Sequence, residues 1–268
     1  TDKYTFFKLE ITELIDNKQK PQLAELSIDA STELPYSDYT RTLDIDNAIH
    51  TVMYKENGIT FKREYFMSYP DNIMVMRLTS DSKKGKLSRI ISLESLHTDK
   101  TITADGHTIT MTGYPTPVSG DKRVGDAWKN GLKYAQQLVV KNKGGKISVV
   151  DGTKLKVEDA DEIIVLMSAA TNYVQCMDDS YNYFSQEDPL EKVQAMLHKV
   201  ADKKYTALLA THQKDYHSLY DRMRLNLGNL PEAPVAPTDS LLKGMEENTN
   251  SEQENQYLEM LYFQFGRY

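Results

Sequence analysis

The sequence has little of several features that mark common classes of protein. Cys176 is the single cysteine among 268 residues, so an internal disulfide framework is excluded. No apolar run approaches the roughly eighteen residues that a membrane-spanning helix needs. The first residues lack the basic and apolar regions of a secretory signal. The sequence therefore predicts no membrane span, and the cysteine count leaves the redox compartment open.

Positive charge is also scarce. The chain has 32 Lys and Arg against 39 Asp and Glu, which gives a formal net charge of -7. This charge repels phosphate backbones, and no basic stretch is interleaved with aromatic residues. The sequence thus argues against nucleic acid as a partner and against binding to an anionic membrane surface.

Signatures of several reaction classes are missing as well. Walker and Rossmann glycine loops and the G-x-S-x-G elbow are absent. His212 and Asp215 share a helix face, but His217 lies about 140° around the helix from His212, so the three cannot hold one ion. We expect His212 and Asp215 to fix a helix against the rest of the protein and Tyr216 to pack. The sequence predicts no metal and no cofactor.

What is present from residue 40 onward is a series of strands. Runs of β-branched and aromatic residues are separated by turn dipeptides, which are Asn57-Gly58, Asp105-Gly106, Gly144-Gly145, Asp151-Gly152 and Glu158-Asp159. Nine or ten strands without intervening helices indicate an antiparallel arrangement, because parallel strands need long crossover connections. The sequence predicts an antiparallel β-sandwich over residues 40–175.

Helical patterns lie on both sides of this region. We expect an N-terminal helical segment over 1–39 and a helical linker over 176–228, which begins its first helix at Asp188-Pro189 and returns to the sandwich in a last strand at 224–228. Prolines about three residues apart predict an extended linker over 229–250. Ser251 and Glu254 form a capping-box pattern at the start of a helix over 251–268.

The last predicted helix carries an unusually aromatic face. Its members recur at helical spacing and are Tyr257, Leu258, Leu261, Tyr262, Phe265 and Tyr268. An apolar face of this size needs a partner. We expect it to be covered by a neighbouring molecule or by the sandwich.

The polar loop over 113–131 holds the candidate substrate-binding residues. Trp128 and Tyr114 are aromatic and could together form a platform on which a sugar ring stacks. The competing expectation is that each ring packs against its own domain.

Several stretches resemble the family-95 glycoside hydrolases, whose best-known members are α-L-fucosidases. They occur in the family's order and are TRTLDIDNAIHTVMY, FKREYFMSYPDNIMVMRLTS, GLKYAQQLVV, DADEIIVLMSAATNY and HQKDYHSLYDRMRLNLG. The final LYFQFGRY is similar to the segment that opens the family's catalytic part. Residues 1–39 match less well, because the family's opening strands with their Gly-Asn-Gly stretch are not present.

The resemblance implies a mainly β fold: a large antiparallel β-sandwich of the supersandwich type, a helical linker and an (α/α)6 barrel whose first helix would be 251–268. It implies an inverting, metal-free and cofactor-free hydrolase of terminal α-linked fucose on glycans, secreted or periplasmic. The family's catalytic glutamate and aspartate lie in the barrel, so no catalytic residue is assigned here. The chain is expected to be a non-catalytic N-terminal portion, inactive alone, with its own barrel and a fucosylated glycan as partners.

Three alternatives stay open. Some members of the family prefer α-L-galactosides, which differ from fucosides by one hydroxyl group. The chain could instead be an independent carbohydrate-binding β-sandwich module. A disaccharide phosphorylase would combine a similar sandwich and barrel.

Overall fold

The computed structural model describes residues 36–82, 87–115, 131–175, 183–228 and 236–268. Residues Pro35–Tyr268 form one compact unit, which is described by itself. The helical segment predicted over 1–39 lies outside the described residues up to residue 35. Its last residues belong to a strand that begins at Ser37, because Ser37 already pairs with Lys55 of the next strand.

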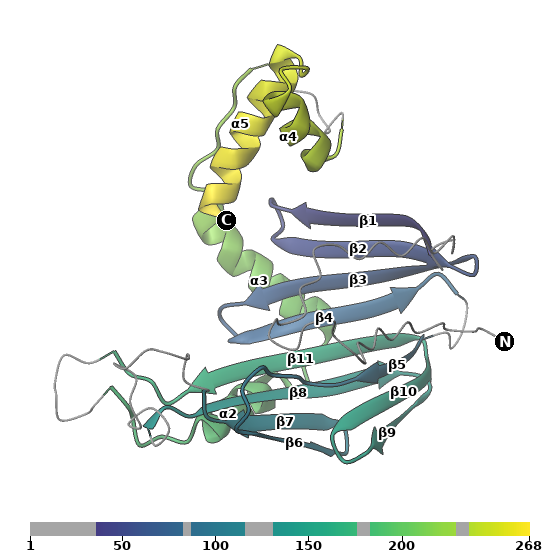
Figure 1. Ribbon diagram of the computed structural model, residues 1–268, viewed down its shortest axis with the longest axis vertical. Helices are drawn as coiled ribbons and strands as arrows, with labels where there is room; N and C mark the ends of the chain where they lie inside the picture. The colour runs from purple at the N-terminus through teal and green to yellow at the C-terminus, as the bar shows by residue number, and fades with distance from the viewer. Residues whose placement is uncertain (1–35, 83–86, 116–130, 176–182, 229–235) are drawn as a thin grey trace, which may run out of the picture. The chain divides into compact units, whose positions relative to one another are not determined.

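Eleven strands within the described residues form two antiparallel sheets (Figure 1). The larger sheet has the order β1 (Ser37–Asp44), β2 (Ile49–Glu56), β3 (Ile59–Ser68), β4 (Ile73–Ser80), β11 (Glu162–Thr171), β8 (Tyr134–Lys143), β7 (Thr108–Gly113) and β6 (Lys100–Asp105). The smaller sheet has the order β5 (Leu87–Ile91), β10 (Lys154–Ala160) and β9 (Lys146–Val150). The predicted mainly β, antiparallel fold class is confirmed.

The turns follow the predicted pattern, with two differences. Glu158 and Asp159, which were predicted to form a turn, lie inside β10, where its register with β5 shifts. Asn57 and Gly58 have φ angles of 50° and 77°, as a type I′ turn requires. In the hairpin of β6 and β7 the turn residues are Gly106 and His107, because Asp105 pairs with Thr108. Positive φ at Gly106 alone is the type II′ pattern, so the turn lies one residue later than predicted.

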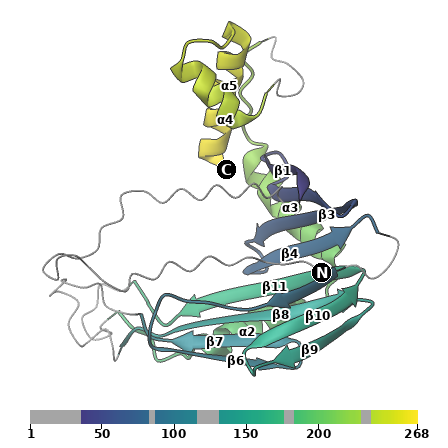
Figure 2. The same ribbon diagram turned by 45° about the vertical axis from the view of Figure 1, so that its right-hand side comes forward.

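The larger sheet is buried on both faces at its centre. On β11, Ile163 and Val165 face the smaller sheet, which lies over this face (Figure 2), whereas Leu166 faces the opposite way. The core between the sheets contains Phe61, Leu78, Leu87, Ile109, Leu138, Val140, Leu155, Val157, Ala160, Ile163 and Val165. Burial on both faces explains why β11 reads as a nearly continuous apolar run.

Four helices lie in the described residues. They are α2 (Pro189–Val200), α3 (Tyr205–Tyr220), α4 (Thr238–Glu246) and α5 (Glu252–Arg267). The predicted caps are present: the Asp188 carboxylate accepts a hydrogen bond from the Leu190 N–H at 2.9 Å, and Ser251 and Glu254 form a capping box. None of these helices is long and apolar enough to cross a membrane.

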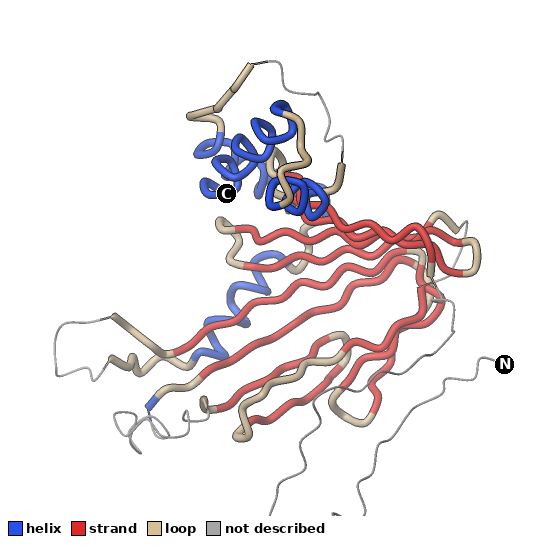
Figure 3. Tube along the Cα trace, turned by 45° about the horizontal axis from the view of Figure 1, so that its top comes forward, coloured by secondary structure: helices blue, strands red, loops and turns tan. Residues whose placement is uncertain are grey.

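Helices α2 and α3 cover the second face of the larger sheet (Figure 3). Val193, Leu197 and Val200 of α2 and Tyr205 and Leu208 of α3 pack there against Phe66, Ile73, Val75, Ala135 and Leu166 of the sheet. The compact unit therefore has three layers: the smaller sheet, the larger sheet in the middle, and the pair of helices α2 and α3.

The region after α3 differs from the prediction in two places. Helix α4 occupies Thr238–Glu246 within the stretch predicted to be an extended linker, and Pro237 precedes it with a φ of -56°. Pro231 and Pro234 lie outside the described residues. The strand predicted at 224–228 is absent, because no strand of either sheet pairs with these residues.

The aromatic face of α5 is covered only in part. Leu258 is buried, and α4 is the element that packs against this helix. Tyr262, Phe265 and Tyr268 remain 82%, 55% and 50% exposed, so the sandwich does not bury these three side chains, and their cover by a neighbouring molecule stays a prediction. Helix α4, which packs against α5, has nine residues, of which Leu241 and Gly244 are buried.

A charged and aromatic cluster lies under the start of α3. Arg77 pairs with Glu162 at 2.8 Å and with Glu64 at 3.3 Å, and its guanidinium carbon lies 4.6 Å from the centre of the Tyr205 ring. The buried Tyr205 hydroxyl makes no hydrogen bond of good geometry with the described residues. Burial, assisted by the negative charge of Glu64, raises the pKa of Tyr205 to about 12.

Replacement of Tyr205 by Phe is expected to flatten the alkaline loss of stability. An unfolded tyrosine ionises near pH 10, whereas the folded Tyr205 keeps its proton until about pH 12, so stability falls as the pH rises between these values. Urea unfolding at pH 7, 9.5 and 11.5 should show a decline smaller by about 1–2 kcal/mol in Tyr205→Phe. The exposed Tyr69→Phe serves as the control, and equal declines in both variants would contradict the assignment.

Candidate functional site

A polar pocket lies at one end of the larger sheet, where β6 begins, β7 ends and β8 begins. Its volume is about 160 Å³, and its lining consists of Asp99, Thr101, Thr112, Gly113, Tyr114, Lys133, Tyr134, Asp188 and Pro189. Pockets for drug-sized ligands span roughly 300–1,000 Å³. The pocket is therefore large enough for one small ring and no more.

Antiparallel register brings the parts of the pocket together. Lys100 of β6, Gly113 of β7 and Tyr134 of β8 lie opposite one another in adjacent strands. The Tyr114 N–H donates a hydrogen bond to the Asp99 carbonyl oxygen at 3.0 Å. A Cβ at position 113 would lie within 3.0 Å of this carbonyl and of the Tyr134 ring, so only glycine fits there.

The buried Asn172 holds the opposite wall of the pocket. Its Oδ1 accepts a hydrogen bond from the Lys133 N–H at 2.7 Å, and its Nδ2 donates one to the Gly131 carbonyl at 2.7 Å. Both ends of this side chain are thus used to fix the start of β8 against the end of β11. Because the amide is buried, its loss would leave unpaired backbone groups.

The lining residues are mostly polar. They include Asp99, Asp188 and Lys133, together with threonines and tyrosines whose hydroxyl groups can both donate and accept hydrogen bonds. One oxygen of the Asp188 carboxylate is already used to cap α2. Within the described ranges no three His, Cys, Asp or Glu side chains gather closely enough to hold a metal ion.

Of the two predicted stacking residues, only Tyr114 lies within the described residues. Tyr114 is half-buried and lines the pocket. Trp128 lies outside the described residues, as does Cys176, so the Trp128 platform stays a prediction. Asp99, Lys133 and Tyr134 were not predicted, because Asp99 directly precedes β6 whereas Lys133 and Tyr134 are neighbours at the start of β8, and no local motif links the two segments.

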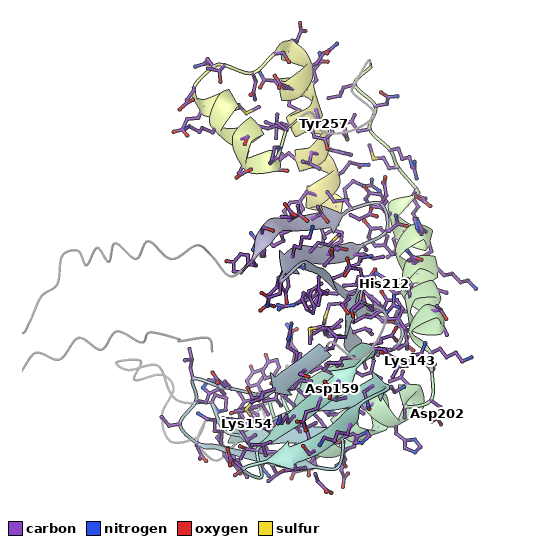
Figure 4. The ribbon with its side chains drawn as sticks, turned by 90° about the vertical axis from the view of Figure 1, so that its right-hand side faces the viewer. Lys143, Lys154, Asp159, Asp202, His212 and Tyr257 are labelled. Carbon is purple, nitrogen blue, oxygen red and sulfur yellow. The ribbon has the colours of Figure 1, made fainter. Side chains whose placement is uncertain are left out.

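His212 has a structural position on α3 (Figure 4). Its ring stacks on Phe66 with centroids 4.8 Å apart, and its Nε2 lies 3.0 Å from the Ala48 carbonyl oxygen. The Tyr216 hydroxyl donates to the Ile45 carbonyl at 2.6 Å. The packing roles of His212 and Tyr216 are confirmed, whereas the Asp215 side chain makes no ion pair or hydrogen bond within the described residues.

These observations define a class, the large antiparallel β-sandwich domains that lead into helices. Residues 8–176 match the model of the glycosyl hydrolase family 65 N-terminal domain, and residues 204–268 match that of the glycosyl hydrolase family 95 catalytic domain. The chain belongs to the family of glycosyl hydrolase family 65 N-terminal domains and, together with the second match, is a family-95-like N-terminal region. The resemblance to family 95 is confirmed.

Relatives with fucosidase names support this placement. The probable alpha-fucosidase A of Aspergillus niger is 28% identical over 252 residues, which cover 92% of this chain and 30% of that protein. The alpha-L-fucosidase 2 of Arabidopsis thaliana is 30% identical over 247 residues, which cover 87% of this chain and 28% of that protein. The chain thus spans about a third or less of the curated relatives that it matches.

The match to the family 95 catalytic domain includes three of the four described helices. It starts at residue 204 and so includes α3 and α4 as well as α5. Sequence reasoning had placed the family's catalytic part only at the last helix. Helix α3 thus lies within the family 95 match, although its Tyr205 and Leu208 pack against the larger sheet.

Proposed function

We propose that the chain is the non-catalytic N-terminal portion of a glycoside hydrolase of the α-L-fucosidase type. The observation that carries the proposal is the succession of a family 65 N-terminal match and a family 95 catalytic match along one chain with fucosidase relatives. The parent enzyme would remove terminal α-linked fucose from glycans with inversion and would be secreted or periplasmic. Its catalytic carboxylates would lie in a helical barrel that the sandwich supports.

The contact between α3 and α5 supports this division of roles. The Arg267 guanidinium donates hydrogen bonds to the carbonyl oxygens of Tyr220 at 2.7 Å and of Met223 at 2.6 Å, and it lies 5.0 Å from the centre of the Tyr220 ring. A cation at the last carbonyls of a helix is favourable. Arg267 therefore fastens the end of α5 to the sandwich-bound α3 and leaves the Tyr262 side of α5 available to a barrel.

The domain division is part of the proposal. It comprises an N-terminal segment up to the start of β1 at Ser37, the sandwich up to residue 175, a helical linker over 176–228, a Pro-rich linker over 229–250 that contains α4, and the first barrel helix over 251–268. Its own barrel and a fucosylated glycan would be the partners of this portion.

The 268-residue chain is expected to release no phenol from an aryl α-L-fucoside. An extended version that includes the proposed helical barrel should hydrolyse the substrate and give the inverted sugar first, as followed by proton NMR. An aryl α-L-galactoside in the same assay separates the fucosidase from the α-L-galactosidase alternative. Turnover by the 268 residues alone would refute the assignment of roles.

Polar substitutions on the exposed side of α5 should matter only in the extended protein. Tyr262→Gln with Phe265→Gln is expected to lower its free energy of unfolding by about 2–4 kcal/mol, because both rings would become buried against the barrel. The same pair should change the 268-residue chain by less than about 0.5 kcal/mol. Leu258→Ala, which removes a side chain already buried, should destabilise both proteins in urea unfolding.

A carbohydrate-binding module is the second candidate, and the pocket beside Tyr114 favours it. In that case calorimetric titration of the 268-residue chain with fucosylated glycans should show binding that Trp128→Ala and Tyr114→Ala each weaken by about tenfold. Binding that both variants leave unchanged would reject these two residues as the platform.

A further inference from the structure

Two exposed tyrosines lie parallel to each other at the end of β11. The ring centroids of Tyr173 and Tyr183 are 6.5 Å apart, and their planes differ by 9°. The side chains are 49% and 46% exposed. This spacing is that of an offset-stacked pair, so the two rings together present a flat apolar surface to solvent.

The backbone on both sides of the pair is held by hydrogen bonds. The Val174 N–H donates to the Tyr183 carbonyl at 2.9 Å, and the Ser185 N–H donates to the Asn172 carbonyl at 2.8 Å. Phe184 lies between these bonds and packs on Gly131, where a Cβ would come within 3.0 Å of three atoms of the ring. The segment is thus anchored through Phe184, and its neighbour Tyr183 stays outside.

Tyr183 also has an unfavourable backbone conformation. Its φ of 62° is in the left-handed region, which residues with a side chain rarely adopt. This conformation does not bury the ring, because the ring remains about half exposed. The unfavourable backbone conformation of Tyr183 thus places an exposed ring parallel to the Tyr173 ring without burying it. Such a conformation points to a binding role.

The tyrosine pair is close to the polar pocket. Thr171 lies opposite Tyr134, which lines the pocket, and Tyr173 follows two residues or about 7 Å later along the chain. Asn172, between them, holds the Lys133 N–H of the pocket wall. A flat aromatic surface and a set of hydroxyl-binding groups therefore share one end of the sandwich.

We propose that the Tyr173–Tyr183 pair is a carbohydrate-binding platform that stacks on the C–H face of a neutral pyranose, while the adjacent pocket binds hydroxyl groups of the same glycan. The partial negative charge of an aromatic face attracts such C–H groups. Within the described residues no hydrogen bond engages either phenol hydroxyl, so both can contact the sugar rim. The proposal that the ligand is a carbohydrate rests on the proposed function. The parallel geometry of the two rings is observed independently of that function.

The test is titration of the 268-residue chain with methyl α-L-fucopyranoside, fucosyllactose and methyl β-D-galactopyranoside. Saturation-transfer NMR identifies the sugar face that contacts the protein, and calorimetry with fucosyllactose gives the affinity. Tyr173→Ala and Tyr183→Ala are each expected to weaken binding by about tenfold. Tyr173→Phe keeps the ring and should stay within about threefold of the unchanged protein.

The chain offers a matched control on its β1 edge. Tyr36 and Tyr39 are 40% and 53% exposed, and their ring centroids are 5.9 Å apart, but the planes are inclined by 50°. Tyr39→Ala removes as much exposed ring as Tyr173→Ala without touching the parallel pair. Binding should be unchanged in this variant, and urea unfolding checks that every variant is folded.

The outcomes separate this inference from the proposed function. Binding of any of the three sugars that Tyr173→Ala and Tyr183→Ala each weaken by about tenfold or more supports the platform, even if the extended protein fails to cleave fucosides. Absence of binding to all three sugars, or equal binding by Tyr173→Ala, overturns the platform, whatever the extended protein hydrolyses. Loss of self-association in Tyr173→Ala by sedimentation, without an effect on sugar binding, would identify the pair as a contact between two copies and would also overturn it.

Discussion

Burial of both faces of the central strands is the constraint on which the rest of the structure depends. Ile163 and Leu166 of β11 are apolar, point to opposite faces and are both inaccessible to water. Such a strand is stable only if separate layers cover the two faces. The small sheet of β5, β10 and β9 supplies one layer, and α2 and α3 supply the other. The position of α3, and with it the path of the chain toward α5, follows from this requirement.

Aromatic and polar contacts of α3 continue this arrangement toward the C-terminus. His212 and Tyr216 bind backbone carbonyls at Ala48 and Ile45 in the β1–β2 connection. Tyr216 stacks on Tyr220 with centroids 4.8 Å apart, and Arg267 of α5 lies over Tyr220. Burial raises the pKa of Tyr220 above its usual value, although the nearby Arg267 guanidinium acts in the opposite direction. A chain of contacts thus links the sheet through α3 to the helix that carries the exposed rings.

Sequence patterns predicted much of the fold but little of the site. The strands, α2, α3 and α5 were predicted. Tyr114 lines the pocket, whereas its predicted role in stacking on a sugar stays a prediction. The other lining residues escaped prediction because Asp99, Lys133 and Asp188 meet only through the register of β6, β7 and β8 and the start of α2. Helix α4 was missed because the prolines before it suggested an extended chain, although a proline directly before a helix is compatible with helix formation.

The sequence by itself determined the features that a few neighbouring residues decide. Asn57-Gly58 accepts positive φ, Asp188 caps a helix that starts with proline, and Ser251 and Glu254 satisfy each other's backbone groups. Only the tertiary structure decided that Ile163 pairs with Leu78, that the strands divide into sheets of eight and three, and that Tyr262 stays exposed. The physical reason is range: turns and caps depend on local backbone energies, whereas strand pairing and burial depend on which distant apolar faces can exclude water together.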